Sequence, residues 1–353
     1  MTPGPTRIPD DVQMSMAKVM INPDVDPEFG TLYRSILDDV ATLYDTEHDI
    51  VILGGEGILG LEAAVASTVS PGDQVLCIAN GLYGDGFADF VEMYGGEPVI
   101  AQHEYDEPID PAAVESLLDE HDDISLATMV HCETPTGVLN DLDPILEVLE
   151  NAGVLSIVDA VSSLAGTPVP VDDIDICLGA SQKCLSAPPG LTTVTVSDRA
   201  WEHIESTPQR SFYASLEPWK DVEVIDDIAP ALPYTHLVSN LYALEAAVSR
   251  LLDEGRDSVF ERHRDAARYC REMGDNIGLE SYAPESLTSP TVTAFHVPGE
   301  AQRITQAVYE QYNLLLATSL GPFADDILRV GHMGYGADRE AVGRTMQAIE
   351  AVY

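Results

Sequence analysis

Positive charge is what this sequence has least of. Its 17 lysine and arginine residues face 60 aspartates and glutamates, so the formal net charge is −43 at neutral pH. Only three cations are lysines: Lys18, Lys183 and Lys220. A surface of this sign repels nucleic-acid phosphates and anionic lipid, so neither nucleic acid nor membrane is an expected partner. Such a surface is also typical of proteins in concentrated salt, which screens repulsion between carboxylates. We therefore expect a halophilic, cytoplasmic protein.

Long apolar runs, a signal segment and paired cysteines are also missing. No run approaches the roughly 18 apolar residues that a membrane-spanning helix needs. The opening MTPGPTRIPDD has neither the basic nor the apolar part of a signal peptide. The five cysteines are odd in number and scattered, which argues against a disulfide framework or a zinc-spaced pair. With 45% hydrophobic and 22% charged residues, the composition predicts a folded protein.

Short β-rich runs alternate with helical segments from about residue 50 to 200. Asp110-Pro111 and Asp143-Pro144 each predict a helix start, with the acid as N-cap, and Gly153 predicts the end of the second helix. This alternation predicts a largely parallel sheet with ligands at the carboxyl ends of its strands. The expected strands are 51–55, 74–80, 98–102, 124–131, 154–160, 175–181 and 191–197.

The pattern changes after about residue 200. A long helical region is expected at 238–273, then strands at 289–297 and 327–333 with a helix at 301–312 between them. We expect the first thirty residues to hold little periodic structure and to form an arm. The predicted organisation is an N-terminal arm at 1–20, a large α/β domain at 21–240 and a small C-terminal α+β domain at 241–353.

A glycine-rich turn follows the first expected strand. Gly55, Gly57 and Gly60 match the spacing of a dinucleotide-binding turn. That function needs an acidic residue at the end of the next strand, which here ends at Asn80. A tight strand-to-helix turn also requires glycines, so the dinucleotide site is disfavoured. What remains is a helix start whose amides can hold an anionic or hydrogen-bonding group.

Lys183 and Asp159 form the strongest chemical signal. Lys183 follows the expected strand 175–181, and a solvated surface charge is a weak explanation in a chain with three lysines. Burial would lower the pKa of its amine, as a Schiff-base lysine requires. Asp159 ends the strand 154–160, where a carboxylate can pair with a pyridinium nitrogen, although a helix cap is the alternative for this residue alone. The two residues in this order favour a pyridoxal site.

With these residues in place, the sequence resembles the class V, fold-type I pyridoxal-phosphate enzymes of the alanine–glyoxylate and serine–pyruvate aminotransferase group. The resemblance runs in the family order over nearly the whole chain. It implies a mainly parallel seven-stranded sheet domain with a smaller C-terminal α+β domain. The matching segments are TPGPT (2–6), GGEGILGLEAAVAS (54–67), ANGLYGDGFA (79–88), HCETPTGVL (131–139), VDAVSSLAG (158–166), SQKCLSAPPG (181–190), THLVSNLYAL (235–244) and LRVGHMG (328–334).

The resemblance also implies roles for individual residues. Lys183 would form the Schiff base and shuttle a proton, and Asp159 would protonate the ring nitrogen. Arg329 would grip the carboxylate of the amino or oxo acid, bidentately as arginine can. The cofactor-binding positions carried over are Glu56, Gly57, Ile58, Tyr83 and Val161 (the two ring faces), Thr134 (ring hydroxyl), Gln182 and Thr235. Thr235 would reach the neighbouring subunit's site, which implies a homodimer.

The phosphate-binding turn departs from the family pattern. Most of the group has Ser or Thr where this chain has Glu56, and an ionised glutamate offers a phosphate only acceptors. Leu232 stands where the family usually has a phosphate-binding tyrosine. Two phosphate contacts are therefore missing. The glutamate resembles that of pyridoxamine–pyruvate aminotransferases, which implies that Glu56 accepts a hydrogen bond from a free hydroxymethyl group. Those enzymes carry a second arginine where this chain has the run 318–321 (Thr-Ser-Leu-Gly), so the oxo-acid grip differs.

The sequence therefore predicts an aminotransferase that moves an amino group between pyridoxamine and a small 2-oxo acid: pyridoxamine and pyruvate give pyridoxal and L-alanine. The alternative is an alanine–glyoxylate or serine–pyruvate aminotransferase with PLP as cofactor, in which Glu56 turns outward. A non-catalytic protein that stores or senses pyridoxal through Lys183 is disfavoured, because a binder does not need Arg329. No metal is expected.

Overall fold

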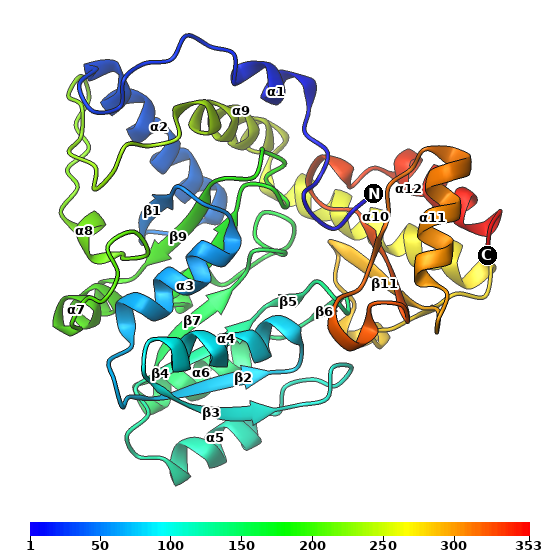
Figure 1. The fold of residues 1–353 in the computed structure, drawn as a ribbon, viewed down its shortest axis with the longest axis horizontal. Helices are drawn as coiled ribbons and strands as arrows, with labels where there is room; N and C mark the ends of the chain where they lie inside the picture. Colours follow the sequence, from blue (N-terminus) through cyan, green and yellow to red (C-terminus); the bar gives the residue numbers. More distant parts are fainter.

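The computed structural model describes residues 1–353 and contains the predicted seven-stranded sheet (Figure 1). The strand order is β1-β9-β8-β7-β4-β2-β3, and only β9 runs antiparallel to its neighbours. All seven expected strands are confirmed to within about two residues at each end. Their bounds are β1 (Asp49–Leu53), β2 (Gln74–Ala79), β3 (Glu97–Gln102), β4 (Leu126–Val130), β7 (Leu155–Asp159), β8 (Ile176–Ala180) and β9 (Thr192–Val196).

Helices between these strands complete the large lobe, and one core of 67 buried residues holds it together. The Asp110 cap is confirmed, since its carboxylate accepts from the Ala112 amide at 3.0 Å, and Gly153 ends its helix with φ 72°. Asp143 is not the N-cap that we expected: Leu142 takes that place, and Asp143 is the first helical residue. The helices are α2 (Pro27–Tyr44), α3 (Gly57–Thr68), α4 (Leu82–Met93), α5 (Pro111–Glu120), α6 (Asp143–Ala152), α7 (Asp198–Ser206), α8 (Glu217–Lys220) and α9 (Val238–Glu254).

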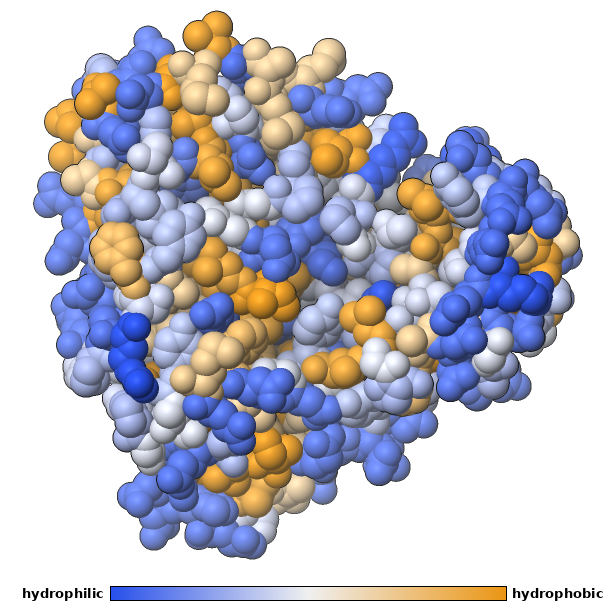
Figure 2. All heavy atoms as spheres, viewed as in Figure 1, coloured by the Kyte–Doolittle hydropathy of each residue, from blue (hydrophilic) through white to orange (hydrophobic).

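A second, smaller lobe lies at the right of Figure 1 and has its own core of 15 buried residues. Its antiparallel sheet has the order β10-β11-β13-β12, and its outer surface is mostly hydrophilic (Figure 2). The expected helical region 238–273 is two helices, α9 and α10, separated by Gly255 with φ 84°. The elements are α10 (Arg256–Asn276), β10 (Glu280–Ser281), β11 (Val292–His296), α11 (Ala301–Tyr312), β12 (Ala317–Thr318), β13 (Ile327–Gly331) and α12 (Arg339–Glu350).

The N-terminal segment contains more structure than we expected. A short helix, α1 (Asp10–Ser15), packs against α9, and α2 already begins at Pro27 behind an Asp26 cap. The residues before α1 lie between the two lobes (Figure 1): the Thr6 amide donates to the Gln182 carbonyl at 2.9 Å. None of the helices combines the length and the apolar composition that crossing a membrane requires.

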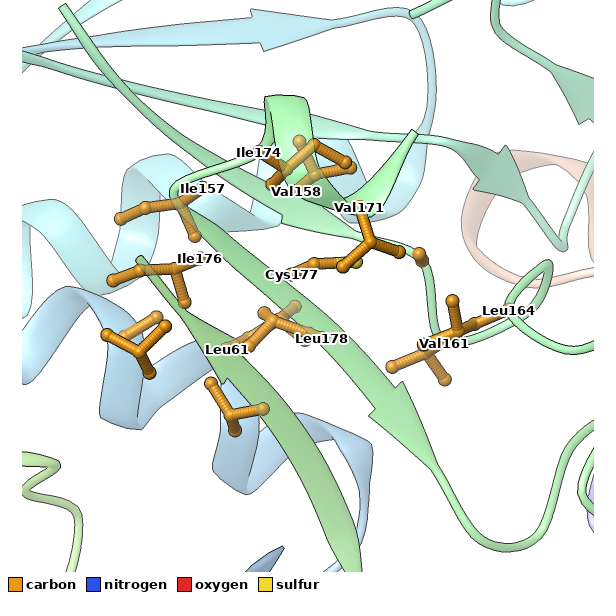
Figure 3. Close-up of a cluster of buried hydrophobic side chains, with 14 of the residues drawn as sticks. Leu61, Ile157, Val158, Val161, Leu164, Val171, Ile174, Ile176, Cys177 and Leu178 are labelled. Atoms are coloured by element: carbon orange, nitrogen blue, oxygen red, sulfur yellow. The ribbon is translucent and has the colours of Figure 1, made fainter. Parts of the chain in front are cut away.

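The central strands place two side chains side by side at the carboxyl edge of the sheet. Asp159 is the last residue of β7, and the turn with Lys183 follows the end of the neighbouring strand β8. The buried core continues to this edge, where Leu61 and Val161 belong to the hydrophobic cluster in Figure 3. A rigid apolar scaffold therefore supports the polar groups at the strand ends.

Candidate active site

A cavity of about 290 Å³ lies at this carboxyl edge, and eight of the predicted site residues line it. The eight come from the start of α3, the start of α4, the end of β7 and the turn after β8. They are Glu56, Gly57, Ile58, Tyr83, Asp159, Val161, Gln182 and Lys183. Residues far apart in the chain thus converge on one small site, of the size that suits a single aromatic ring with short substituents.

Lys183 supplies the amine of the cavity. Burial lowers the pKa of its ammonium group, and the nearby charge of Arg329 lowers it further, whereas Asp159 raises it. Its Nζ donates to the Pro3 carbonyl at 3.1 Å, so the N-terminal segment reaches the reacting group. The other two lysines form surface ion pairs, Lys18 with Glu245 and Lys220 with Glu205. Lys183 is therefore the lysine whose surroundings favour the neutral, nucleophilic amine.

Asp159 lies buried beside this lysine, with one carboxylate oxygen already used. Its Oδ1 accepts from the Val161 amide at 2.8 Å within the turn that follows β7; no helix begins there, so the helix-cap alternative is wrong. Burial raises the pKa of the Asp159 carboxyl to about 6, against the lowering effects of that amide and of Lys183. The second oxygen accepts no hydrogen bond within the chain, so it can accept one from a protonated ring nitrogen.

Tyr83 and Val161 provide an aromatic and an aliphatic surface to the same cavity. Tyr83 is the second residue of α4, and Val161 follows β7, where it packs against Gly57. A Cβ added at Gly57 would lie 3.2 Å from both methyl groups of Val161, so the glycine allows α3 to approach this wall closely. Two apolar surfaces of this kind suit a flat ring between them.

Glu56 caps helix α3 and lines the cavity. The Glu56 carboxylate accepts from its own helix's Ile58 amide at 3.2 Å and from the Gln182 side-chain amide at 3.3 Å. Because an ionised carboxylate only accepts, the NH₂ group of Gln182 must face Glu56. The Oε1 atom of Gln182 is buried and has no partner within the chain. The cavity therefore presents acceptors beside Glu56, and one amide of the first turn of α3 is already occupied by Glu56.

Arg329 and Thr134 adjoin each other behind the cavity and do not line it. The Arg329 guanidinium donates to the Thr318 carbonyl at 2.8 Å through Nε and to the Thr134 carbonyl at 3.4 Å through Nη1. Its Nη2 donates to nothing in the chain and is free for a ligand carboxylate. The Thr134 hydroxyl is hydrogen-bonded to Ser162, which does line the cavity.

Thr235 lies outside the cavity, exposed on the surface. Its hydroxyl donates to the Asp24 carboxylate at 3.1 Å. Leu232 makes no side-chain hydrogen bond to the glycine-rich turn, but two nearby tyrosines do. The Tyr234 hydroxyl accepts from the Gly54 amide at 3.2 Å, Tyr213 donates to the Gly54 carbonyl at 3.2 Å, and the two rings stack at 4.4 Å. These tyrosines stabilise the turn that carries Glu56.

Comparison with known proteins decides the family. The model of the family described as "Aminotransferase class-V" matches residues 14–322. The chain belongs to the class V aminotransferases. Pyridoxamine–pyruvate transaminase of Mesorhizobium japonicum is 34% identical over 341 residues, covering 95% of this chain and 86% of its own. Alanine–glyoxylate aminotransferase of Oryctolagus cuniculus is 30% identical over 363 residues, covering 98% of this chain and 90% of its own.

Solved structures agree with this assignment. The pyridoxamine–pyruvate aminotransferase of Mesorhizobium loti superposes with a TM-score of 0.92 at 33% identity, covering 99% of this chain and 91% of its own. The expected fold-type I architecture and the enzyme class, a transaminase, are confirmed, and the family implies pyridoxal-phosphate-dependent chemistry. Two named relatives of similar identity act on different substrates, so identity alone leaves the substrate of this aminotransferase open.

Sequence reasoning missed several residues at the site of this aminotransferase, including Leu61, Ser162 and Pro189 of the cavity lining. Gly4 and Pro5 line the cavity, although their segment TPGPT entered only as a family resemblance. Glu133 is fully buried beneath Tyr83 and carries no recognisable catalytic spacing. A larger cavity of about 820 Å³ lies between the N-terminal segment and the small lobe, but no lysine lines it. The one lysine at either cavity, Lys183, lines the smaller one.

Proposed function

We propose that this aminotransferase moves an amino group between free pyridoxamine and a small 2-oxo acid, so that pyridoxamine and pyruvate give pyridoxal and L-alanine. One observation carries the proposal: the Glu56 carboxylate caps α3 where the family binds a phosphate, with the unpartnered Oε1 of Gln182 beside it. A hydroxymethyl group donates one hydrogen bond, and two acceptors lie at this end of the cavity to receive it.

A phosphate group fits this end poorly. The Ile58 amide at the start of α3 already donates to Glu56, so one of the amides that a helix N-terminus offers to such an anion is occupied. Two unit charges about 4 Å apart repel by about 4 kcal/mol at an effective dielectric constant of 20, and a phosphate dianion doubles that term. The phosphorylated ring is therefore disfavoured by both hydrogen bonding and charge.

The remaining residues fit an unphosphorylated pyridoxal ring. Its flat faces suit the space between Tyr83 and Val161, and its nitrogen suits the free oxygen of Asp159. When bound, the ring supplies the electron sink for amino-group transfer. In our proposal Lys183 contributes its amine as the Schiff-base partner and then holds and returns the transferred proton at Nζ. Burial keeps a fraction of that amine neutral, as both tasks require.

Arg329 is the proposed binding group for the oxo acid. Two of its three nitrogens are held by backbone carbonyls of Thr318 and Thr134, which fix the plane of the guanidinium. A fixed plane loses little entropy when Nη2 and the free hydrogen of Nη1 bind a carboxylate. With no second arginine in the run 318–321, a single arginine serves the carboxylate, and we assign a small 2-oxo acid as the class of acceptor.

The second candidate function is alanine–glyoxylate or serine–pyruvate transfer with PLP as a resident cofactor. Its support is the exposure of Glu56, since an exposed side chain can give up its hydrogen bonds to Ile58 and Gln182 and turn to solvent. The Ile58 amide would then become available to a phosphate.

We also infer a homodimer that works in high salt. Large apolar side chains are exposed in residues 14–25 and 212–237, for example Phe212 at 74% and Val19 at 89%. The two segments meet where Thr235 donates to Asp24. Large exposed apolar side chains gathered in two segments that contact each other are typical of a subunit interface. Light scattering in concentrated potassium chloride should give the mass of two chains; a single-chain mass would contradict the inference.

The function is tested by turnover without PLP. Enzyme freed of bound ligand is mixed with pyridoxamine and pyruvate in concentrated salt, and pyridoxal and alanine are measured together with any ligand released from the purified protein. We expect equal amounts of both products, without added PLP, and none from Lys183→Ala. If pyridoxamine is not used and copurified PLP supports alanine–glyoxylate exchange, the second candidate replaces the first.

A further inference from the structure

Glu133 is a buried carboxylate that the proposed reaction does not use. It is the last residue of the short strand β5 (Cys132–Glu133) and is 0% exposed. No arginine or lysine forms an ion pair with it, and Asp85 and Asp159 lie close enough to oppose its ionisation. Burial raises the pKa of the carboxyl to about 8. Charges in such surroundings are costly unless other groups stabilise them, so its partners need an explanation.

Those partners are the first free amides of helix α4. The Gly84 amide donates to Oε1 at 2.7 Å, and the Tyr83 amide donates to Oε2 at 3.2 Å. Helix N-termini are normally capped by the preceding side chain, but the N-cap residue here is Gly81, which has none. The cap for α4 thus comes from β5, 49 and 50 residues along the chain, and the helix N-terminus stabilises the ionised form of Glu133.

Gly81 and Glu133 are matched to each other. A Cβ added at Gly81 would lie 2.1 Å from Cδ of Glu133, which is far inside contact distance. Gly81 has φ −178°, an extended conformation that any residue adopts, so the glycine is required for space rather than for backbone freedom. The space it leaves is filled by the carboxylate that caps the helix.

The capped residue is the one that forms a face of the cavity. Tyr83 lines the site, and its own amide is held by Glu133. Glu133 also precedes Thr134, whose carbonyl accepts from Arg329. One buried carboxylate therefore fixes the backbone on which the ring-facing tyrosine is carried, next to the strand that orients the arginine.

We propose that Glu133 is a positioning residue that sets the Tyr83 face of the ring-binding cavity by capping α4 from β5, with Gly81 as its required neighbour. The proposal rests on the proposed function in one respect, that a pyridoxal-type ring is the ligand. It predicts that loss of the cap weakens ring binding more than it slows turnover, because Tyr83 contacts the ring without taking part in proton transfer.

The test uses the full-length enzyme as purified and measures its affinity for 4-deoxypyridoxine, an unreactive analogue of the ring. Binding is measured at pH 9, above the raised pKa of the Glu133 carboxyl. Glu133→Gln keeps the shape but turns one acceptor into a donor that faces an amide. Loss of a hydrogen bond to a charged group should weaken binding of the probe by about tenfold or more. The matched control, Asp110→Asn, makes the same carboxylate-to-amide change at the cap of α5, away from the cavity, where one oxygen is enough to keep the hydrogen bond.

Two further measurements separate positioning from simple loss of structure. Amide hydrogen exchange without ligand should become faster over residues 81–86 in Glu133→Gln and stay unchanged there in Asp110→Asn. The KM for pyridoxamine should rise while kcat changes less than about threefold. Gly81→Ala should reproduce these effects, and Gly81→Ala combined with Glu133→Gln should add little to either, because both remove one interaction.

Several results would overturn the inference. If amide exchange over residues 81–86 is unchanged in Glu133→Gln, Glu133 does not stabilise the start of α4. If exchange is faster but the probe binds as before, Glu133 stabilises the helix without positioning Tyr83 for the ring. An equal loss in Asp110→Asn would mean a general loss of stability. If the wild-type enzyme does not bind the probe, the proposed function fails and the inference fails with it. If wild type and Glu133→Gln bind the probe with equal affinity, the inference about Glu133 is wrong but the proposed function stands.

Discussion

The floor of the cavity and its rim are built in opposite ways. The floor consists of Asp159, Val161 and Lys183, which stand at the ends of adjacent central strands on a closely packed core. The rim consists of Glu56 and Ile58 at the start of α3, both exposed. Buried groups on strands have fixed geometry and shifted pKa values, whereas an exposed helix cap can be exchanged at little structural cost. The floor therefore suits the reaction common to the family, and the rim suits the choice of ligand.

The largest effect should come from removing the amine of the floor. Lys183→Ala should reduce amino-group transfer below detection, because no other side chain of the cavity carries an amine. Steady-state production of alanine from pyridoxamine and pyruvate measures this loss. Lys220→Ala is the matched control, since Lys220 forms a surface ion pair with Glu205. Near-normal turnover by Lys183→Ala would mean that the floor of the cavity does not carry out the amino-group transfer.

Asp159→Asn should have the next largest effect, with turnover falling at least about a hundredfold while the preference between rings stays unchanged. The amide still occupies the site but cannot stabilise a protonated ring nitrogen. The thermal unfolding midpoint should stay close to that of the wild type, which reports an intact fold. If turnover falls only a fewfold, Asp159 serves to accept the hydrogen bond of the Val161 amide and does not stabilise the ring nitrogen.

Arg329→Lys tests the arginine that adjoins the cavity through Thr134. Lysine cannot reproduce the planar fork, so the KM for pyruvate should rise about 10- to 100-fold while ring affinity changes little. Arg344→Lys is the control, because Arg344 forms only an exposed pair with Glu340. Equal losses for pyruvate and for the ring would place Arg329 outside the oxo-acid site.

A buried histidine directly after β13, the strand that carries Arg329, should make the stability depend on acid. His332 is buried with Nδ1 facing the Pro290 carbonyl and Nε2 near the Thr293 hydroxyl, and burial lowers its pKa from 6.5 to about 3. A lowered histidine pKa stabilises the folded protein above pH 6.5, and the contribution is lost as the pH falls toward 3. Between pH 7 and pH 5 the wild type should lose about 2 kcal/mol that His332→Gln does not lose.

Urea unfolding of both proteins at the two pH values measures this difference. The gap in unfolding free energy between wild type and His332→Gln should shrink by that amount at pH 5. A gap that does not depend on pH would mean that the histidine is not neutral in the folded protein.

The floor could be predicted from the sequence, and the rim only in part. Asp159 ends one strand and Lys183 follows another, and both strands have a clear apolar pattern. Because β7 and β8 are parallel neighbours, their carboxyl ends bring the two residues to the same edge of the sheet. Glu133 could not be found in this way, because its partner amides lie 49 and 50 residues away and nothing local marks it as a cap. Likewise, the sequence identified Glu56 as unusual but could not show that Gln182 must turn its NH₂ group toward it.

The direct test of the central claim, that the rim chooses the ligand, is the ratio of kcat/KM for pyridoxamine to that for pyridoxamine phosphate, with pyruvate in concentrated salt. The ratio is measured for wild type, Glu56→Ser and the control Glu62→Gln, which alters a residue of the same helix that bonds to Tyr94. We predict that wild type and the control favour pyridoxamine and that Glu56→Ser shifts the ratio at least about tenfold toward the phosphate. An unchanged ratio in Glu56→Ser, or a wild type that prefers pyridoxamine phosphate, would contradict the account.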